Sequence, residues 1–248
     1  MHPVLVSIGP FHIYSWGTMF ALAFIVGTWL AAKEARRRGY DPGIVVDLAA
    51  YSVVSSLIGA RLLYVLLDPS EFAGNPWRVL FITEGGLSLH GGVLGVMLMG
   101  IWFSRRYKVP FWGFADILAP SVPLGTAITR IGCFLNGCCY GVLTRVPWAS
   151  FTRLASGPRH PTQIYEMLLD LVLFIYLWRK RDRIAFPGAL FLDYVVGYSV
   201  IRFIVEYWRD VPHITPFLSV AQGASLVVIA GAYLMGKFLK RKAGRISP

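Results

Sequence analysis

Charged residues are scarce in this chain of 248 residues, where Asp, Glu, Lys and Arg together make up only 15%. Soluble domains carry about 25% charged residues and about 45–50% apolar ones, whereas this chain is 56% hydrophobic. The shortage of charge therefore excludes an ordinary soluble domain and indicates a protein that resides in lipid. Acidic residues are the scarcer kind, 13 against 24 Lys and Arg, and the net charge is +11.

Several other features are missing. The only cysteines are Cys133, Cys138 and Cys139, so a disulfide scaffold spread along the chain is excluded. No Lys or Arg precedes Tyr14, so the basic start of a cleaved signal peptide is absent and the first apolar stretch is expected to stay in the mature protein. A Walker loop, a G-x-S-x-G elbow and an H-E-x-x-H pair are absent too, which leaves ATPase, hydrolase and metalloprotease functions without a motif.

Long apolar runs predict an all-α, polytopic membrane protein that forms one domain over residues 1–248. About seven transmembrane helices are expected, near residues 13–32, 44–67, 88–104, 113–133, 163–178, 187–207 and 217–236. Pro120 and Pro123 interrupt the fourth, a break that membranes tolerate where protein or water satisfies the backbone.

Basic residues alternate between the loops. Of the 24 Lys and Arg, 16 follow the first, third, fifth and seventh predicted spans, and five lie in the opposite loops. The positive-inside rule then predicts a multi-pass protein of a bacterial inner membrane, with the amino terminus outside and the carboxyl terminus cytoplasmic. The segment near 134–162 is expected to be extracytoplasmic. The positive charge is thereby explained by topology and attraction to anionic membrane lipids, not by nucleic acid.

Three arginines remain inside predicted spans: Arg61, Arg130 and Arg202. Each would cost about 2.5–3.5 kcal/mol at the centre of a membrane helix, and such residues usually face a functional path. Tyr198 and Glu206 lie four residues before and after Arg202, on the same helix face. This stripe is a candidate binding surface. The alternative is that Arg202 and Glu206 only neutralise each other.

Arg130 opens a segment that runs to Gly141 and contains Gly132 and Asn136. Glycines allow a ligand to approach the backbone closely, and the side-chain amide of Asn136 can donate a hydrogen bond. A guanidinium group suits phosphate because its planar fork donates two parallel hydrogen bonds. The segment predicts a phosphate cradle. The alternative is that Arg130 snorkels to the outer interface.

Two further groups could carry chemistry. His90, flanked by glycines at the start of an apolar span, is either a proton acceptor or a hydrogen-bonded structural residue. The cysteine spacing Cys133-x4-Cys138-Cys139 is wrong for a paired CxxC zinc site, and no fourth ligand presents itself. Small apolar packing residues are the favoured interpretation of these cysteines, so we expect no metal and no cofactor.

The chain resembles the prolipoprotein diacylglyceryl transferases over nearly its whole length. The matching segments, in order, are Ser7–Pro10, Gly59–Arg61, Gly85–Gly92, Arg130–Gly141, His160–Glu166 and Arg202–Glu206. In place of the family's usual Asn, Glu and Tyr, this chain has Cys133, Cys138 and Trp16.

The resemblance implies transfer of the diacylglyceryl group of phosphatidylglycerol to the lipobox cysteine of a prolipoprotein signal peptide, with release of glycerol phosphate. It implies catalytic roles for His90, Arg130 and Arg202. Lipid or substrate binding is expected at Arg61, Gly132, Asn136, Gly141, Tyr198 and Glu206. Two rival functions are an anion or phospholipid transporter and a non-catalytic scaffold for anionic lipid. A transporter would predict inverted repeats, which the sequence does not show.

Overall fold

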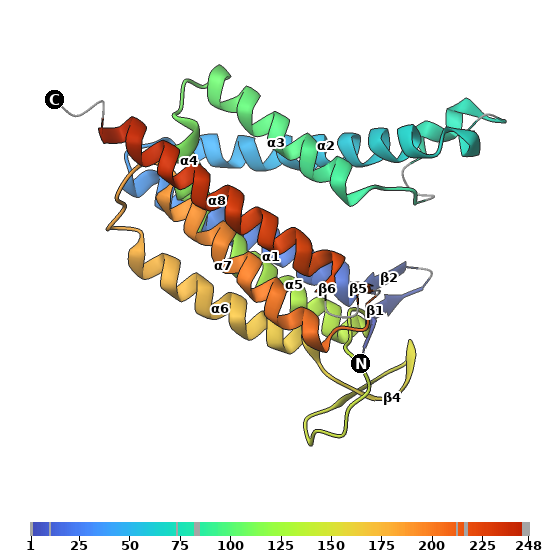
Figure 1. Cartoon of the computed structure of the whole chain (residues 1–248). Coiled ribbons are helices and arrows are strands. Elements are labelled where there is room, and N and C mark those ends of the chain that lie inside the picture. Colours follow the sequence, from blue (N-terminus) through green and yellow to red (C-terminus); the bar gives the residue numbers. More distant parts are fainter. Residues whose placement is uncertain are drawn as a thin grey trace. The chain divides into compact units, whose positions relative to one another are not determined.

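The computed structural model describes residues 2–9, 11–72, 74–81, 85–211, 213–215 and 218–244. Pro10 of the resemblance and Arg245 of the basic tail lie outside these residues. The chain forms two compact units: Met1–Ala31 together with Ala115–Pro248, and Ala32–Phe114. Long helices dominate both (Figure 1). The expected single domain over 1–248 stays a prediction.

The first unit contains most of the helices. Its elements are β1 (Val4–Ile8), β2 (Phe11–Tyr14), most of α1 (Ser15–Arg37), the end of α4 (Phe111–Leu118), α5 (Ser121–Asn136), β3 (Ser150–Thr152), β4 (Ala155–Arg159), α6 (Thr162–Lys180), α7 (Ala189–Val205), the 3-10 turn η4 (Glu206–Trp208), β5 (His213–Thr215), β6 (Leu218–Ser219) and α8 (Val220–Gly244). The strands form three antiparallel hairpins, β1–β2, β3–β4 and β5–β6.

The second unit is built on a helical hairpin. It contains α2 (Pro42–Leu67), α3 (Leu89–Arg106) and two 3-10 turns, η1 (Pro69–Phe72) and η2 (Pro76–Leu80). A Cβ atom on Gly91 would overlap the backbone oxygen of Gly59, and one on Gly95 would overlap that of Ser55. Small residues therefore let antiparallel α2 and α3 approach to backbone contact, as in small-xxx-small packing of membrane helices.

The predicted all-α polytopic membrane protein is confirmed. Four stretches of the described chain are long and apolar enough to cross a membrane: α1, α2, α4 with α5, and α8. The helices α3, α6 and α7 coincide with predicted spans but fall short of that criterion, so the number seven stays a prediction. Glu166 and Asp170 lie in α6 and lower its hydropathy. In the fourth predicted span, α4 ends at Leu118 and α5 begins at Ser121, which confirms the expected break beside Pro120.

The core of the first unit lies between α6 and α7. Leu173 and Leu177 of α6 pack against Leu190, Ile201 and Val205 of α7. The side chain of Asp116 is buried and accepts hydrogen bonds from the backbone N–H groups of Gly188 and Phe191. Gly188 precedes α7 and has no side chain to cap it, so Asp116 fixes the start of the helix that carries Arg202.

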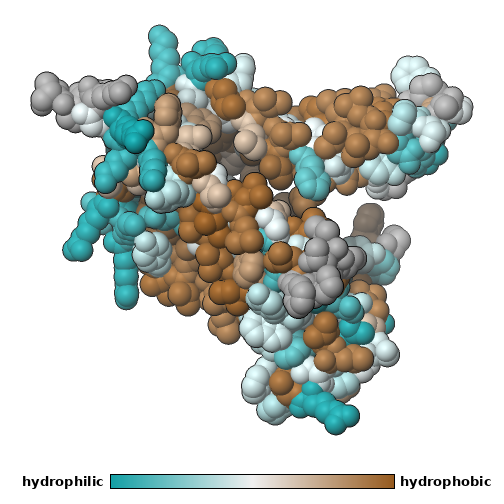
Figure 2. All heavy atoms as spheres, in the orientation of Figure 1, coloured by the Kyte–Doolittle hydropathy of each residue, from teal (hydrophilic) through white to brown (hydrophobic). Residues whose placement is uncertain are grey.

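The segment predicted to lie outside the membrane is ordered. We call its residues 137–161, between α5 and α6, the arm. Between α5 and α6 the chain forms the β3–β4 hairpin, which extends past the amino end of α6 (Figure 1). Two isolated β-bridges hold the arm. One pairs Gly141 of the arm with Arg209, the residue that follows η4. The other pairs Leu143 with Arg159, and both of these residues lie in the arm. Figure 2 shows apolar side chains over the helices of this unit and hydrophilic ones near the carboxyl end of α8.

Candidate active site

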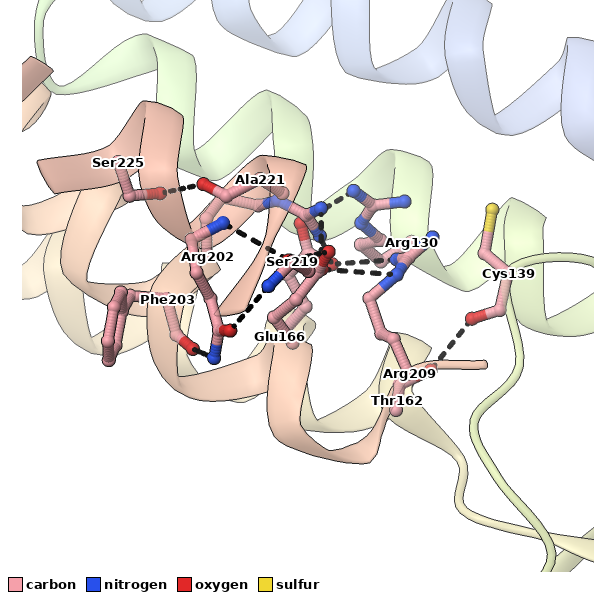
Figure 3. Close-up of polar contacts among 12 residues, drawn as sticks. Arg130, Cys139, Thr162, Glu166, Arg202, Phe203, Arg209, Ser219, Ala221 and Ser225 are labelled. Carbon is pink, nitrogen blue, oxygen red and sulfur yellow. Dashed lines mark hydrogen bonds and ion pairs between the residues drawn. The ribbon is translucent and has the colours of Figure 1, made fainter. Parts of the chain in front are cut away.

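Glu166, near the start of α6, is the centre of a buried ion-pair network (Figure 3). Its side chain is 1% exposed. Arg130 of α5 donates from Nη2 to Glu166 Oε1 at 2.5 Å. Nη1 of Arg202, from α7, lies 3.6 Å from Glu166 Oε2. The two arginines that the sequence predicted to form a site therefore meet at one carboxylate, although they come from different helices.

A third arginine joins this network. Nη1 of Arg209, just after η4, lies 3.8 Å from Glu166 Oε2. A second buried carboxylate, Glu206, pairs with Arg202 at 3.0 Å and with Arg209 at 3.7 Å. The hydroxyl of Ser219 donates to the other oxygen of Glu206 at 2.8 Å. The arginine cluster, as we call Arg130, Arg202 and Arg209, thus shares two carboxylates.

The arginine cluster retains capacity for an anion. Three guanidinium groups face the carboxylates of Glu166 and Glu206, so the paired groups alone leave net positive charge. Nε of Arg130 and Nε of Arg209 are buried and have no hydrogen-bond partner among the described residues. Buried donors in folded proteins are nearly always satisfied. An acceptor supplied from outside the chain, such as a phosphate oxygen, would satisfy them.

Asp170 lies one turn after Glu166 on α6 and is fully buried. Neither of its carboxyl oxygens has a hydrogen-bond partner in the described part of the chain. Arg130, Arg202 and Glu166 all lie within its electrostatic range. The surroundings of the arginine cluster therefore include a further buried carboxyl group, that of Asp170.

Gly141 positions Arg209 through the backbone. Its N–H donates to the His160 carbonyl at 2.9 Å, and the next N–H, of Val142, donates to the Trp208 carbonyl at 2.9 Å. A Cβ atom on Gly141 would overlap the Trp208 oxygen. The absence of a side chain at this position therefore permits the contact between the arm and the residue before Arg209. This gives the predicted site residue Gly141 a positioning role.

The remaining predicted residues of this unit lie nearby. Gly132 packs on α1, since a Cβ there would lie 2.8 Å from the Met19 Cβ. Asn136 is the last residue of α5 and is partly exposed. Tyr198 lies on α7 within electrostatic range of Glu166 and of two of the arginines. The stripe of Tyr198, Arg202 and Glu206 thus faces the site, and the Arg202–Glu206 pair belongs to a network larger than a self-neutralising couple.

Arg61 lies in α2, within the second predicted span. It belongs to the second unit and is buried, with 6% of its surface exposed. All five of its N–H donors are engaged by backbone carbonyls, those of Arg78, Val79, Phe81, Gly85 and Gly86. No donor of Arg61 is left for a lipid headgroup, so the geometry favours a structural role. Arg61 fixes the loop that leads to His90.

His90 begins α3 in the second unit and has an exposed side chain. Ser88 N–H donates to the Ala60 carbonyl at 3.0 Å, which ties the loop before His90 to α2. His90 as proton acceptor stays a prediction.

The three cysteines lie together at the end of α5. Their Sγ atoms are all within 4.8 Å of one another, and Cys133 Sγ lies 3.9 Å from Arg130 Nη1. The pKa of the Cys139 thiol is lowered to about 5, chiefly because the Cys133 thiol donates a hydrogen bond to it. Burial opposes this shift, while Arg209, the Cys138 thiol and Arg130 add to it. Cysteine spacing alone did not indicate this convergence.

Sequence reasoning missed two members of the site. Arg209 was counted among the basic residues of a loop, and Glu166 was noted only as the end of a matching segment. No periodicity joins Glu166 to Arg130, which lies 36 positions earlier. The signal that was available for Glu166 was its place in an apolar helix, where a carboxylate needs a partner.

Known proteins match this chain over almost its full length. A family model described as LGT, prolipoprotein diacylglyceryl transferase, matches residues 3–236. Three curated relatives are each named phosphatidylglycerol–prolipoprotein diacylglyceryl transferase. The relative from Synechococcus elongatus is 36% identical over 92% of this chain and 84% of its own length. Those from Bordetella bronchiseptica and Geobacter sulfurreducens are 35% and 34% identical, over 94% and 96% of this chain and 93% and 89% of their own.

Proposed function

We propose, from the premise that this chain belongs to the prolipoprotein diacylglyceryl transferase family, that the arginine cluster binds the phosphodiester of the lipid substrate. The protein is a transferase that moves a diacylglyceryl group from phosphatidylglycerol to a prolipoprotein, the first step of lipoprotein maturation. The proposal concerns the residues that do this and the features of the substrates that they recognise.

The observation that carries the proposal is the convergence of Arg130, Arg202 and Arg209 on Glu166. Guanidinium groups bind phosphate oxygens through charge-assisted bonds. The Nε–H groups of Arg130 and Arg209, which lack a hydrogen-bond partner among the described residues, would supply two of those bonds. Because Glu166 and Glu206 hold the guanidinium groups in place beforehand, lipid binding requires little reorganisation. Such prearranged donors in a dry site are often the largest catalytic contribution.

The chemistry follows from these positions. The thiol of the acceptor cysteine loses its proton, and the thiolate attacks the glyceryl carbon bonded to the phosphate oxygen. A C–S bond forms while the C–O bond breaks, and the phosphate oxygen keeps the electron pair. Glycerol phosphate leaves with the additional negative charge, which the arginine cluster stabilises. We assign the proton acceptor to His90, directly or through a water molecule. No cofactor takes part.

The acceptor is the lipobox cysteine of a prolipoprotein signal peptide, presented at a bacterial inner membrane. The topology of the first unit supports an orientation of the protein in that membrane. Basic residues lie at the carboxyl ends of α6 and α8, Arg179 with Lys180 and Arg241 with Lys242, and the arm lies at the amino end of α6 (Figure 1). The basic ends are therefore assigned to the cytoplasm and the arm to the outer side, with the amino terminus outside.

A transfer assay tests the function. The purified protein in detergent receives phosphatidylglycerol labelled in its acyl chains and a synthetic lipobox peptide, and lipidated peptide is measured. The expected result is a labelled thioether product, none with a peptide in which Ser replaces the lipobox Cys, and far less with phosphatidylethanolamine. Lipid binding without product would support a scaffold. In a parallel assay with the protein in vesicles, passage of labelled lipid across the vesicle membrane without product would support a transporter. Either result overturns the proposal.

A further inference from the structure

The cysteines form a cluster that the transfer reaction does not use. We propose that Cys133, Cys138 and Cys139 form a binding site for a soft d10 cation, either Cu⁺ held by three thiolates or Zn²⁺ with water as a fourth ligand. We call these residues the thiol cluster. The three thiols take no part in the lipid chemistry assigned to the arginine cluster.

The spacing of the sulfur atoms supports the proposal. The three Sγ atoms lie within 4.8 Å of one another. Zinc–thiolate bonds are about 2.3 Å long, so thiolates around one tetrahedral ion lie about 3.8 Å apart. Rotation of the side chains is enough to close the difference. Cys133 is buried while Cys138 and Cys139 are partly exposed, so an ion from solvent has a route to the cluster.

The backbone holds the sulfur atoms in this arrangement. The side chain of Thr162 donates to the Cys139 carbonyl at 2.7 Å, and that of Gln163 donates to the Cys138 carbonyl at 2.5 Å. Both donors are buried residues of the first turn of α6. The loop that carries two of the thiols is therefore anchored to α6 and does not depend on a metal for its position.

Cys139 adopts a left-handed backbone conformation, with φ of 61°. Residues with a side chain seldom adopt it, and it occurs at sites where function constrains the chain. Gly137, two residues earlier, is left-handed as well, with φ of 81°. The two turns reverse the chain after α5, so the thiol of Cys139 returns to the thiol of Cys133.

The ligands of the thiol cluster and the charges around it indicate which ions it would bind. No histidine or carboxylate of the described chain belongs to the same group, and purely thiolate sites select soft ions such as Cu⁺ and Zn²⁺. Three thiolates around either ion leave net negative charge. Arg130 approaches Cys133 at 3.9 Å, and Arg209 lies within electrostatic range of Cys139. These guanidinium groups offset the charge of the metal complex.

Metal titration of the tag-free protein tests the site. Protein purified in detergent with reductant, without oxygen, is titrated separately with Zn²⁺ and Cu⁺ against a competing chelator. One ion per chain is expected, with an ultraviolet thiolate-to-metal absorption band. Each single Cys→Ala variant should weaken binding at least about 10-fold. Ser156→Ala, an arm variant that keeps all three thiols, should bind as the parent does.

Three results overturn the proposal. The first is binding that exceeds one ion per chain or persists unchanged in Cys139→Ala, which identifies adventitious binding. The second is a thiol count of one with a mass two hydrogens lower, which identifies a disulfide. The third is an absence of binding by protein that retains its thermal unfolding midpoint. Cys→Ser variants with the parent midpoint show that lost binding reflects lost ligands and not misfolding.

Discussion

Arg130 Nη2 donates to Glu166 Oε1 at 2.5 Å, across 36 residues of intervening sequence. This bond joins α5 to α6 at the one place where both helices carry a charge in an apolar environment. The buried carboxylate of Glu166 and the partly buried guanidinium of Arg130 each carry a desolvation cost, which their pairing offsets. The pair therefore holds Arg130 in a single orientation, toward Arg202 and Arg209.

Arg130→Ala should lower the transfer rate at least about 100-fold, since removal of one donor to a developing oxyanion has effects of that size. Arg130→Lys should recover only part of the activity because an ammonium group keeps the charge but loses the planar fork. Initial rates of peptide lipidation measure both. Arg145→Ala changes an exposed arginine of the arm and should keep the parent rate. Near-parent activity of Arg130→Ala would remove Arg130 from the mechanism.

Glu166→Gln should destabilise the protein and make its stability depend on bound anionic lipid. The substitution keeps the shape but removes the charge that three arginines share, so their mutual repulsion is no longer balanced. Loss of one partner of a buried ion pair costs about 3–5 kcal/mol, and the amide should recover part of this. Thermal unfolding in detergent should show a lower midpoint and a larger upward shift with phosphatidylglycerol than in the parent.

The matched control for that experiment is Asp210→Asn. Asp210 pairs with Arg159 at 2.7 Å, but its side chain is 55% exposed, so solvent screens the pair and little stability should be lost. If both variants respond equally to phosphatidylglycerol, the lipid does not act at Glu166.

Much of the fold could be predicted because apolar runs and prolines act locally. The helices begin and end close to the predicted spans, and the break beside Pro120 was expected. Two of the three arginines of the cluster, Arg130 and Arg202, were predicted, because a charge inside an apolar span is visible in the sequence while the partner of that charge is not. Arg61 shows what the sequence leaves undetermined. An arginine in an apolar span needs hydrogen-bond acceptors, but backbone carbonyls of the same chain can supply them as well as a lipid headgroup can.

The cysteines illustrate a different limit. The spacing rules for zinc sites assume that the chain between two cysteine ligands forms a standard knuckle. The segment Cys133-x4-Cys138-Cys139 does not have the spacing of such a knuckle. The structure brings the sulfur atoms together through the left-handed Gly137 and Cys139. Sequence periodicity carries no information on such a turn, because glycine is only permissive there and the cysteine adopts the same conformation against its preference.

Gly141→Ala should lower activity without removing any charged group. The added Cβ would overlap the Trp208 carbonyl, and the backbone must shift, at a cost of about 1–3 kcal/mol for overpacking. The shift would displace Arg209, the next residue, from Glu166. Lipidation rates and unfolding midpoints should both fall. Gly231→Ala places a Cβ on α8 where no atom lies within 4 Å and should leave both unchanged; equal behaviour of the two variants would contradict the positioning role.

Gly91→Leu should disrupt the second unit. Even a Cβ at this position overlaps the backbone oxygen of Gly59, so α2 and α3 would have to separate. Helix packing in lipid depends on such close contact, and the unfolding midpoint should fall sharply. Gly223→Leu, in α8, adds the same side chain where nothing lies within 4 Å of the Cβ. A midpoint lowered no further by Gly91→Leu than by Gly223→Leu would show that the tight contact does not stabilise the hairpin.

His90→Gln should lower the transfer rate and flatten its dependence on pH. An imidazole accepts a proton only in its neutral form, so in the parent the rate should fall as the pH is lowered and His90 becomes charged. Glutamine keeps hydrogen bonding but cannot accept the proton. The peptide thiol also ionises as the pH rises, and this contribution is common to both proteins. The difference between the two pH profiles therefore isolates His90, and two profiles that differ neither in slope nor in height would assign the proton to another group.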